Sequence, residues 1–281
     1  MQPLFIGIIG LGLIGGSFAR AIKAYTPHTV AGYDLDADTM LKARQAGAID
    51  TALDDAALAE CDMLLCALYP SAAIAELLAR LPKLKAGCVV SDLCGVKRAP
   101  CDALDAPCRA AGMVFVGAHP MAGREFSGFD YTKSELFSGA SLILTPTQPE
   151  QGAQAQAVSL WRELAAAVGF GSVTVTTPDH HDCMIAYTSQ LAHVLSNAYV
   201  KSPRAPEHPG YSAGSFKDLT RVARLNEVMW TELFLANRDS LADELGILID
   251  NLTAYKTALE AQDGDTLKAL LKDGRERKER L

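Results

Sequence analysis

The sequence predicts an α/β protein in which a doubly wound, mostly parallel β-sheet is followed by an all-helical region. Three observations predict this fold class. Up to Thr177, short apolar runs alternate with segments of helical periodicity. From Pro178 onward, no segment has the pattern of a strand. The chain has 281 residues, 49% of them hydrophobic, which is enough to bury the cores of two domains.

The first expected strands are short apolar runs bounded by turn residues, at 4–9, 29–33, 63–67, 88–92 and 113–117. The expected helices between them include 15–24, 37–46 and 72–81. Strands that alternate with helices in this way form a parallel sheet covered on both faces. The chain therefore begins with a layered α/β domain.

Two further strands, 140–145 and 172–176, flank an expected helix at 154–168. The segments expected to be helical beyond Thr177 are 181–200, 215–223, 226–257 and 266–278. Asp179 follows Pro178 and is a candidate N-cap for the first of these helices. Three prolines between 203 and 209 predict a loop. We therefore expect two domains, residues 1–177 and residues 178–281.

Composition excludes several classes of protein. The net charge is −7 and there is no long Lys/Arg run, so nothing favours a nucleic-acid partner. The weakly charged stretch 4–19 contains five glycines, which is unlike a membrane span or a signal peptide. Seven cysteines without a CxxC pair are typical of reduced thiols, so we expect a cytoplasmic protein. His180, His181 and Cys183 have no second ligand cluster, so no metal site is expected.

A glycine motif lies between the first expected strand and the first expected helix. It reads Gly10-Leu11-Gly12-Leu13-Ile14-Gly15, which matches the GxGxxG pattern of a Rossmann-type dinucleotide-binding domain. The first glycine permits the tight turn, the second lets a pyrophosphate approach the backbone, and the third lets helix and strand pack closely. The N-terminus of the helix, with Leu13 and Ile14, supplies N–H groups for the phosphates. We therefore expect residues 1–177 to bind a dinucleotide.

An acidic residue at the end of the second strand indicates which dinucleotide. Asp34 lies 19 residues after Gly15, where a carboxylate accepts hydrogen bonds from the adenosine ribose and repels a 2′-phosphate. NAD is therefore favoured over NADP. Asp36 is the nearby competitor for this role, and its alternative role is a helix N-cap.

His119 is a candidate catalytic residue in the stretch VGAHPMAGREFSGF. The strand expected at 113–117 leads directly to it, so its imidazole should lie at the carboxyl end of the sheet, where doubly wound folds bind ligands. Pro120 restricts His119 to extended geometry. Histidine accepts a proton near neutral pH. The sequence around His119 leaves a catalytic base and a packed side chain equally open.

Two segments of the helical region contain candidate ligand-binding residues. Ser189, His193 and Asn197 recur every four residues on a mostly apolar helix, which predicts a polar seam that lines a site or an internal hydrogen-bond network. Lys217 and Arg221 are also four residues apart, and Arg224 follows them. The planar guanidinium of Arg221 suits a carboxylate. The alternative is a solvated basic helix.

Together these stretches resemble the prephenate dehydrogenase family of tyrosine biosynthesis. The matching segments occur in the order of the family and are GLGLIGGS (10–17), SDLCGVK (91–97), GAHPMAGREFSG (117–128), PDHHD (178–182), SQLAH (189–193) and AGSFKDLTRVA (213–223), followed by Trp230. The resemblance implies NAD-dependent oxidative decarboxylation of prephenate to 4-hydroxyphenylpyruvate. It also implies a homodimer formed through the C-terminal helices.

The resemblance assigns roles residue by residue. His119 matches the catalytic histidine that accepts the proton of the ring hydroxyl. Residues that match substrate-binding positions are His193, Arg221, Ser189, Gly214, Trp230 and Gly95, with Gly214 and Trp230 in some cases contributed by the partner subunit. His181 matches a further histidine with a structural role. Two departures bear on substrate choice: Gly95 replaces a serine found in many members, and Gln190 replaces a histidine.

Three alternatives stay open. An extra carboxylate near the pocket would favour an arogenate dehydrogenase, whose substrate carries an ammonium group, and Glu125 and Asp218 are the candidates. A β-hydroxyacid dehydrogenase or imine reductase would depend on a lysine of the helical domain, here Lys217. A non-catalytic NAD-binding sensor would require His119 to be dispensable.

Overall fold

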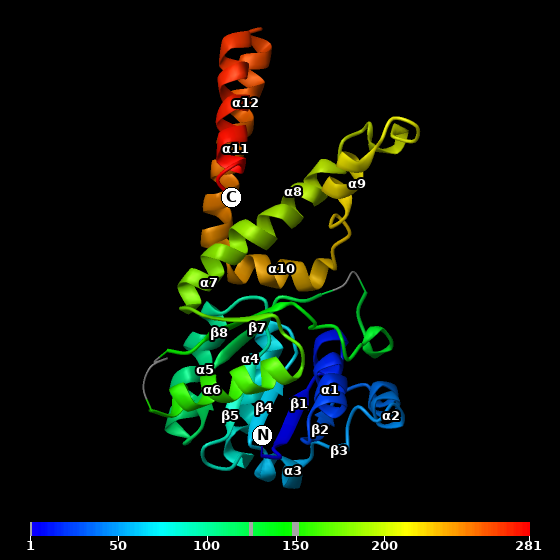
Figure 1. Cartoon of the computed structure of the whole chain (residues 1–281), viewed down its shortest axis with the longest axis vertical. Coiled ribbons are helices and arrows are strands. Elements are labelled where there is room, and N and C mark those ends of the chain that lie inside the picture. Colours follow the sequence, from blue (N-terminus) through cyan, green and yellow to red (C-terminus); the bar gives the residue numbers. More distant parts are fainter. Residues whose placement is uncertain (1, 124–125, 148–151) are drawn as a thin grey trace.

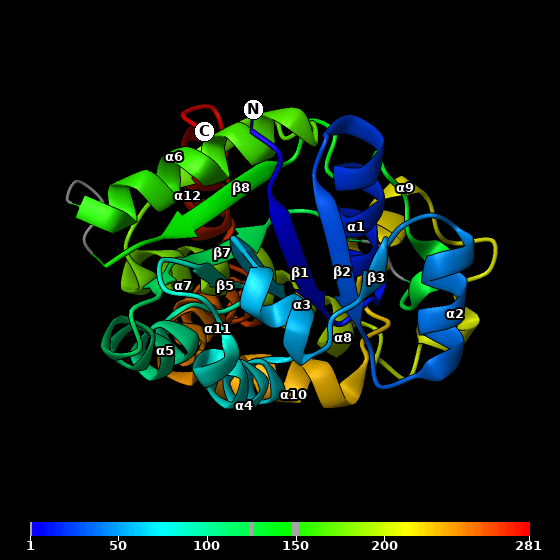
Figure 2. The ribbon, with the colours of Figure 1, turned by 90° about the horizontal axis from the view of Figure 1, so that it is seen from below.

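Six parallel strands form the central sheet of this computed structural model, which describes residues 2–123, 126–147 and 152–281. The strand order is β3-β2-β1-β4-β5-β6, which is typical of the doubly wound fold class predicted from the sequence. The strands are β1 (Phe5–Ile9), β2 (Thr29–Tyr33), β3 (Thr51–Ala52), β4 (Met63–Cys66), β5 (Val89–Asp92) and β6 (Val114–Phe115). β1 pairs with β2 on one side and with β4 on the other. Figure 2 shows β1, β2 and β3 side by side in that order. The crevice between β1 and β4 is therefore the switch point where such sheets bind ligands.

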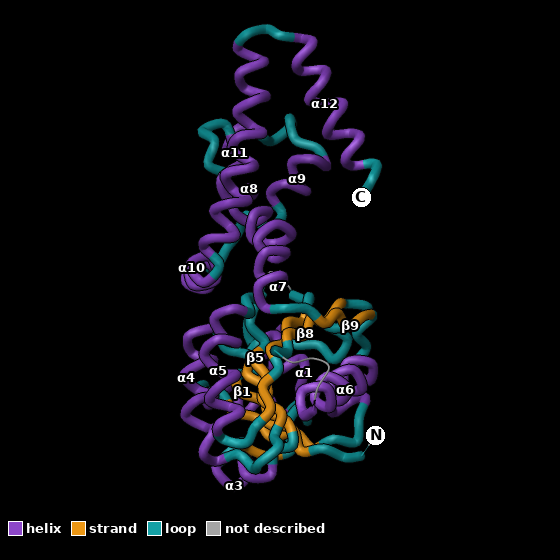
Figure 3. Tube along the Cα trace, turned by 90° about the vertical axis from the view of Figure 1, so that its left-hand side faces the viewer, coloured by secondary structure: helices purple, strands orange, loops and turns teal. Residues whose placement is uncertain are grey.

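Helices cover both faces of this sheet, as Figure 3 shows. One face carries α1 (Leu13–Tyr25), α2 (Ala37–Gln45) and α6 (Gly152–Ala167), and the other carries α3 (Asp55–Glu60), α4 (Pro70–Arg80) and α5 (Arg98–Ala110). Neighbouring residues of β4 point to opposite faces, so Leu65 joins the first core and Leu64 the second. Near-continuous apolar strands are what a sheet buried on both faces requires.

α5 lies outside the segments predicted to be helical, because two prolines obscure its pattern. Pro100 sits in the first turn, where its missing N–H costs little, whereas Pro107 lies inside the helix. The buried residues Cys101, Leu104 and Cys108 follow helical spacing, so burial of this apolar face offsets the hydrogen bond that Pro107 removes.

A second, three-stranded sheet corrects the expected position of His119. The strand predicted at 113–117 ends at Phe115, and Gly117–Pro120 forms β7, which pairs antiparallel with β8 (Ser141–Thr145). β9 (Ser172–Val175) pairs parallel with β8. His119 is thus a strand residue opposite Ile143 and not the first residue of a loop. Glycine is required at 117, since a Cβ there would lie 2.4 Å from Thr145 Oγ1.

The helical region begins directly after these sheets. Its helices are α7 (Pro178–Ile185), α8 (Leu191–Tyr199), α9 (Gly214–Thr220), α10 (Glu227–Ala236), α11 (Arg238–Glu260) and α12 (Gly264–Lys278). The N-cap of α7 is Thr177, whose hydroxyl accepts from the His180 N–H at 3.2 Å. Asp179, predicted to be the cap, lies instead in the first turn, where the helix dipole favours an acid.

The single helix predicted at 226–257 is broken into α10 and α11 at Asn237. In Figure 1, α10 lies across the top of the first domain while α11 rises away from it. Asn237 is fully buried, and its amide donates to the Asp182 carbonyl and to Gln190 Oε1, both at 2.8 Å. These two hydrogen bonds stabilise the turn between α10 and α11. Helical periodicity in the sequence could not predict them, because their partners lie far away in the chain.

α11 and α12 form a hairpin that projects away from the sheet domain, and α8 with α9 forms a second projection (Figure 1). Large apolar side chains lie exposed along these helices, including Ile249 (53% exposed), Leu259 (61%) and Leu271 (64%). Within the described ranges, no helix combines the length and apolarity needed to cross a membrane.

Candidate active site

The glycine motif forms the turn between β1 and α1. Gly10 has φ +82°, a left-handed conformation that favours glycine. A Cβ on Gly15 would lie 1.9 Å from the Gly10 carbonyl oxygen, whereas a Cβ on Gly12 would meet nothing within 4 Å. Gly10 and Gly15 are therefore required by the fold, and Gly12 leaves open space in front of the helix. Leu13 and Ile14 form the start of α1, where the N–H groups have no partner within the helix.

Asp34 is fixed beside this turn. Its Oδ2 accepts from the Leu11 N–H at 2.8 Å and its Oδ1 accepts from the Asp36 N–H at 3.0 Å. Asp36 is the N-cap of α2, because its carboxylate accepts from the N–H groups of Asp38 and Thr39. The alternative role weighed for Asp36 is the one it has, and Asp34 remains the candidate for the ribose.

A buried ion pair connects the end of β5 to β7. The Lys97 ammonium donates to Asp92 Oδ2 and to the Ala118 carbonyl, the latter at 2.7 Å. Both side chains of the ion pair are fully buried. Because Ala118 precedes His119, these contacts hold the strand that carries the histidine against the carboxyl end of the parallel sheet.

His119 is engaged through one of its two ring nitrogens. Its Nδ1 lies 2.8 Å from His181 Nε2, and His181 Nδ1 lies 2.7 Å from Asp182 Oδ1. Burial, together with the neighbouring His181 and the Lys97 charge, lowers the pKa of His119 well below its usual value. Burial also lowers the pKa of His181, although its hydrogen bond to Asp182 acts in the opposite direction. Both rings are therefore neutral at pH 7.

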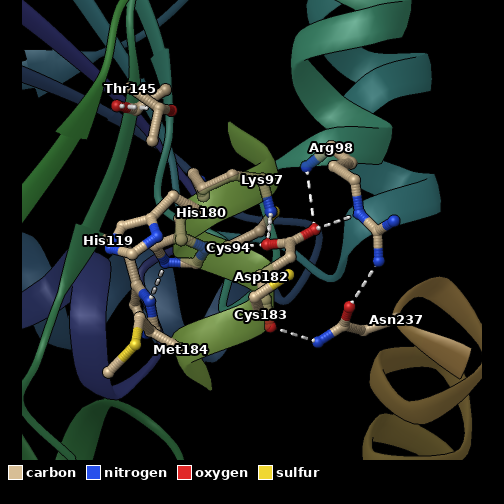
Figure 4. A network of polar contacts seen from close by, with 12 residues as sticks. Cys94, Lys97, Arg98, His119, Thr145, His180, Asp182, Cys183, Met184 and Asn237 are labelled. Carbon is tan, nitrogen blue, oxygen red and sulfur yellow. Dashed lines mark hydrogen bonds and ion pairs between the residues drawn. The ribbon is translucent and has the colours of Figure 1, made fainter. Parts of the chain in front are cut away.

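Asp182 joins the two regions of the chain, as Figure 4 shows. Its Oδ1 accepts from the Lys97 N–H at 2.7 Å and its Oδ2 from the Arg98 N–H at 3.0 Å. Arg98 Nη2 in turn donates to Asn237 Oδ1 at 2.7 Å. Burial raises the pKa of Asp182, but the hydrogen bonds from His181 and these amides outweigh it, so the pKa is lowered and the carboxylate is ionised.

The second nitrogen of His119 faces Gly95. A Cβ built on Gly95 would lie 3.8 Å from His119 Nε2 and 3.6 Å from Leu233 Cδ2. Leu233 belongs to α10, so this helix lies over the same point. Glu232 of α10 also accepts from the Ser71 N–H at 2.6 Å, at the start of α4. α10 therefore covers the carboxyl ends of the strands next to His119.

His193 and Trp230 lie together on the helical side. Their ring centroids are 4.1 Å apart, and His193 Nδ1 donates to the Ser189 carbonyl at 2.8 Å. Burial and the charge of Arg221 lower the pKa of His193, while the bond to Ser189 opposes them. Trp230 and Leu233 are three residues apart on α10, so that helix links His193 to the surroundings of His119.

The helix that carries the predicted polar seam contains an irregular turn. Ala186–Gln190 forms a π-helical turn between α7 and α8, which shifts the register by one residue. Ser189 contacts His193 through its carbonyl, and Asn197 donates to the Ala223 carbonyl at 3.1 Å. Gln190, which replaces a histidine found in many family members, is buried and donates to the Leu233 carbonyl at 3.2 Å. The glutamine therefore contributes to the packing of α10 on this turn.

Arg221 and Gly214 lie at the two ends of α9, and both are exposed. Lys217, Arg224 and Asp218 are exposed as well. Among the contacts of the described residues, none joins this helix to His119. Glu125, the other carboxylate considered for an ammonium group, lies outside the described residues.

Sequence reasoning missed the residues that hold His119 in place. Lys97, Arg98, Asp182 and Asn237 were assigned no role, and His181 was assigned only through the resemblance. One signal was present: PDHHD places a histidine beside a carboxylate at a helix start, which is the usual way to orient an imidazole.

Known proteins resemble this chain over both of its regions. A family profile described as "Prephenate dehydrogenase, nucleotide-binding domain" matches residues 18–169, and one described as "Prephenate dehydrogenase, dimerization domain" matches residues 177–273. A cyclohexadienyl dehydrogenase of Zymomonas mobilis is 36% identical over 272 residues, covering 93% of this chain and 90% of the relative. A prephenate dehydrogenase of Bacillus subtilis is 29% identical over 275 residues, covering 92% and 71%.

Among solved structures, prephenate dehydrogenase from A. aeolicus in complex with hydroxyphenyl propionate and NAD+ superimposes with a TM-score of 0.83. It is 26% identical, and the match covers 100% of this chain and 99% of that one. Both family profiles, the curated relatives and the solved structure indicate the same family. The chain belongs to the prephenate dehydrogenase family of oxidoreductases.

Proposed function

We propose that this chain is an NAD-dependent prephenate dehydrogenase, which oxidises and decarboxylates prephenate to 4-hydroxyphenylpyruvate. The geometry of His119 is the observation that most strongly supports this function. His119 is held through Nδ1, and its Nε2 faces the glycine at position 95, where a substrate hydroxyl can approach. We also propose that residues 1–177 form the dinucleotide-binding domain and residues 178–281 the substrate and dimerisation domain.

The residues around the glycine motif fit NAD. The open space at Gly12, the uncapped start of α1 and the absence of an acid in its first turn suit a pyrophosphate. Asp34, at the end of β2, would hold the adenosine ribose and disfavour the 2′-phosphate of NADP. When bound, NAD supplies the acceptor for the hydride that leaves the ring carbon bearing the hydroxyl.

His119 would move the proton. As the ring carbon is oxidised, Nε2 accepts the hydroxyl proton, which leaves a ketone conjugated to the carbon that bears the ring carboxylate. Loss of carbon dioxide sends the bonding electrons into the ring and produces a phenolate. Nε2–H can then return its proton to that oxygen, so the reaction consumes no net proton. Aromatisation of the ring makes the decarboxylation effectively irreversible.

Substrate binding would use the helical side of the site. His193, with Trp230 packed on it, would contact the ring or its side chain. Arg221 is the candidate for a carboxylate, because its guanidinium is exposed and close enough for its charge to act on His193. Ser189 and Gly214 would contribute through their backbones, since the Ser189 carbonyl already positions His193.

Arogenate is the second candidate substrate. Asp218 lies three residues before Arg221 on α9, and residues at this spacing share a helical face. A carboxylate at that position could meet the ammonium that arogenate carries in place of the keto group of prephenate. The β-hydroxyacid dehydrogenase alternative has less support, because Lys217 is exposed on α9 and, within the part of the chain that the structure describes, makes no contact with His119.

The exposed apolar side chains of the helical domain are best explained by a second copy of this chain. The matched dimerization profile covers residues 177–273, from the start of α7 into α12. We therefore propose a homodimer in which these helices cover one another. Sedimentation or light scattering of the purified protein at micromolar concentration should give twice the chain mass, and a stable monomer would contradict the proposal.

The function can be tested directly with purified protein. We would offer prephenate and then arogenate, each with NAD or NADP, and follow the reduced cofactor by absorbance. We expect the highest kcat/KM with prephenate and NAD. Preference for arogenate would select the second candidate, and turnover with neither substrate would refute both.

A further inference from the structure

Two side chains stand behind His119 in one line of hydrogen bonds. Asp182 Oδ1 lies 2.7 Å from His181 Nδ1, and His181 Nε2 lies 2.8 Å from His119 Nδ1. His181 is 1% exposed and Asp182 is fully buried, so water does not compete for these contacts. The line ends at His119 Nε2, the nitrogen that faces Gly95.

The carboxylate determines where each proton along this line sits. Both oxygens of Asp182 already accept backbone N–H groups, from Lys97 and Arg98, and the side chain of Arg98 lies 3.4 Å from Oδ2. An ionised carboxylate can only accept, so His181 Nδ1 must carry the hydrogen. The Nε2 of a neutral His181 is then an acceptor, and His119 Nδ1 must be the donor.

We propose that His181 and Asp182 are positioning residues, which hold the His119 ring in the tautomer whose Nε2 is unprotonated and directed at the substrate. This inference rests on the proposed function, in which Nε2 of His119 accepts the substrate proton. Without the pair, the ring could turn or carry its hydrogen on Nε2, and it would then have no lone pair for the reaction.

The charged groups around the line favour this arrangement. Lys97, whose charge acts on His119, is paired with Asp92 and held by the Ala118 carbonyl. Arg98 is held by Asp182, Asn237 and Ser240. The Lys97 ammonium thus has a carboxylate of its own in Asp92, and the Arg98 side chain contacts Oδ2 of Asp182, whereas His181 contacts Oδ1.

A matched pair of substitutions at His181 separates positioning from packing. His181→Gln places an amide oxygen at about the reach of the lost Nε2, so it can still accept from His119 Nδ1–H. His181→Met has the same length and no comparable acceptor. We expect kcat of the Gln variant to stay within about 10-fold of the wild type and kcat of the Met variant to fall roughly 10²-fold or more.

A purely structural role would affect both variants alike. KM and NAD affinity should therefore be measured beside kcat, and we expect both to change little in either variant. The pH profile of kcat/KM adds a second readout. Its acidic limb should keep the form of a single base in the Gln variant. Activity in the Gln variant but not in the Met variant would show that the hydrogen-bond acceptor at position 181 is the feature that matters. Equal kcat in the two variants would overturn the proposal.

The tautomer itself can be observed without any substrate. In two-bond ¹H–¹⁵N spectra of histidine-labelled wild-type protein, His119 should show a protonated Nδ1 and an unprotonated Nε2 at pH 7.5, with the signal assigned by its loss in His119→Asn. A protonated Nε2 in the wild type would refute the positioning role even if the enzyme is active. Conversely, absence of turnover with prephenate and arogenate would refute the proposed function while this spectrum still tests the tautomer.

Discussion

Two glycines of one motif should respond in opposite ways to the same substitution. Gly12 and Gly15 both lie at the start of α1, but a Cβ on Gly12 meets nothing within 4 Å, while one on Gly15 would lie 1.9 Å from the Gly10 carbonyl oxygen and 3.0 Å from the Ala67 Cβ. Gly12→Ala therefore adds a methyl group to open space. Gly15→Ala adds it to the contact between α1 and β1.

The expected magnitudes follow from these contacts. In Gly15→Ala the helix must move away from the strand, and overpacking of this kind costs about 1–3 kcal/mol of unfolding free energy or more. In Gly12→Ala, the smaller entropy of the unfolded chain contributes about 0.4–1 kcal/mol, and a poorer N-cap costs a similar amount. The net change should be under about 1 kcal/mol. The added methyl would instead displace the pyrophosphate, and the loss of a charged hydrogen bond worth about 1.5–3 kcal/mol weakens NAD binding roughly 10- to 150-fold.

Urea denaturation and calorimetric titration with NAD measure the two effects separately. We expect Gly12→Ala to unfold like the wild type and to bind NAD weakly, and Gly15→Ala to lose stability first. Wild-type NAD affinity in Gly12→Ala would show that the pyrophosphate does not lie at this turn. Unchanged stability in Gly15→Ala would refute the packing argument.

Other predictions concern the catalytic side. His119→Asn can still donate to His181 but lacks Nε2, so kcat should fall about 10²-fold or more with the NAD dissociation constant unchanged; a mutant that keeps most of its rate would return His119 to a packing role. Gly95→Ala adds a methyl at ordinary contact distance, 3.8 Å from His119 Nε2, so thermal stability should hold while kcat/KM falls because the space before the base is filled; unchanged kcat/KM would place the substrate elsewhere. Arg221→Ala should mainly raise KM, and an unaltered KM would count against its carboxylate role. Finally, the histidines whose pKa is lowered in the folded protein take up protons more readily when unfolded, so the unfolding free energy should decline as pH falls below about 6.5; these are His28, His119, His181 and His193. Denaturant titrations at pH 7.5 and 5.5 check this, and equal or greater stability at pH 5.5 would contradict it.

The sheet and the glycine turn could be predicted because their signals are local. Apolar runs of a few residues define each strand of the central sheet, and the three glycines of the motif serve a turn that spans six positions. The position of His119 was predicted less well. Its distance from the preceding apolar run is visible in the sequence, but the transfer of the chain at Gly117 into a second sheet depends on pairing with β8.

The groups that hold the base in place could not be predicted from local pattern. Lys97 and Asp182 are 85 residues apart in the chain, and Arg98 and Asn237 are 139 apart, yet both pairs are joined by hydrogen bonds. Nothing in the periodicity of either segment depends on the other. The π-helical turn before Leu191 is a similar case, since one extra residue in a turn shifts the face of the helix that a regular four-residue spacing predicts.

The buried pair Lys97–Asp92 shows why such a costly arrangement can persist beside a catalytic base. Removing two charges from water is expensive, and replacement of buried pairs by apolar residues is often neutral or stabilising. Here the lysine does more than neutralise the aspartate. Its ammonium holds the Ala118 carbonyl next to His119, and its backbone N–H holds the carboxylate of Asp182. One residue thus contacts both the strand that carries the base and the acid that orients it. An apolar side chain of the same volume would keep the backbone N–H but lose the contact with the Ala118 carbonyl. The ion pair therefore serves to position His119. Its loss should lower kcat more than it lowers the free energy of unfolding.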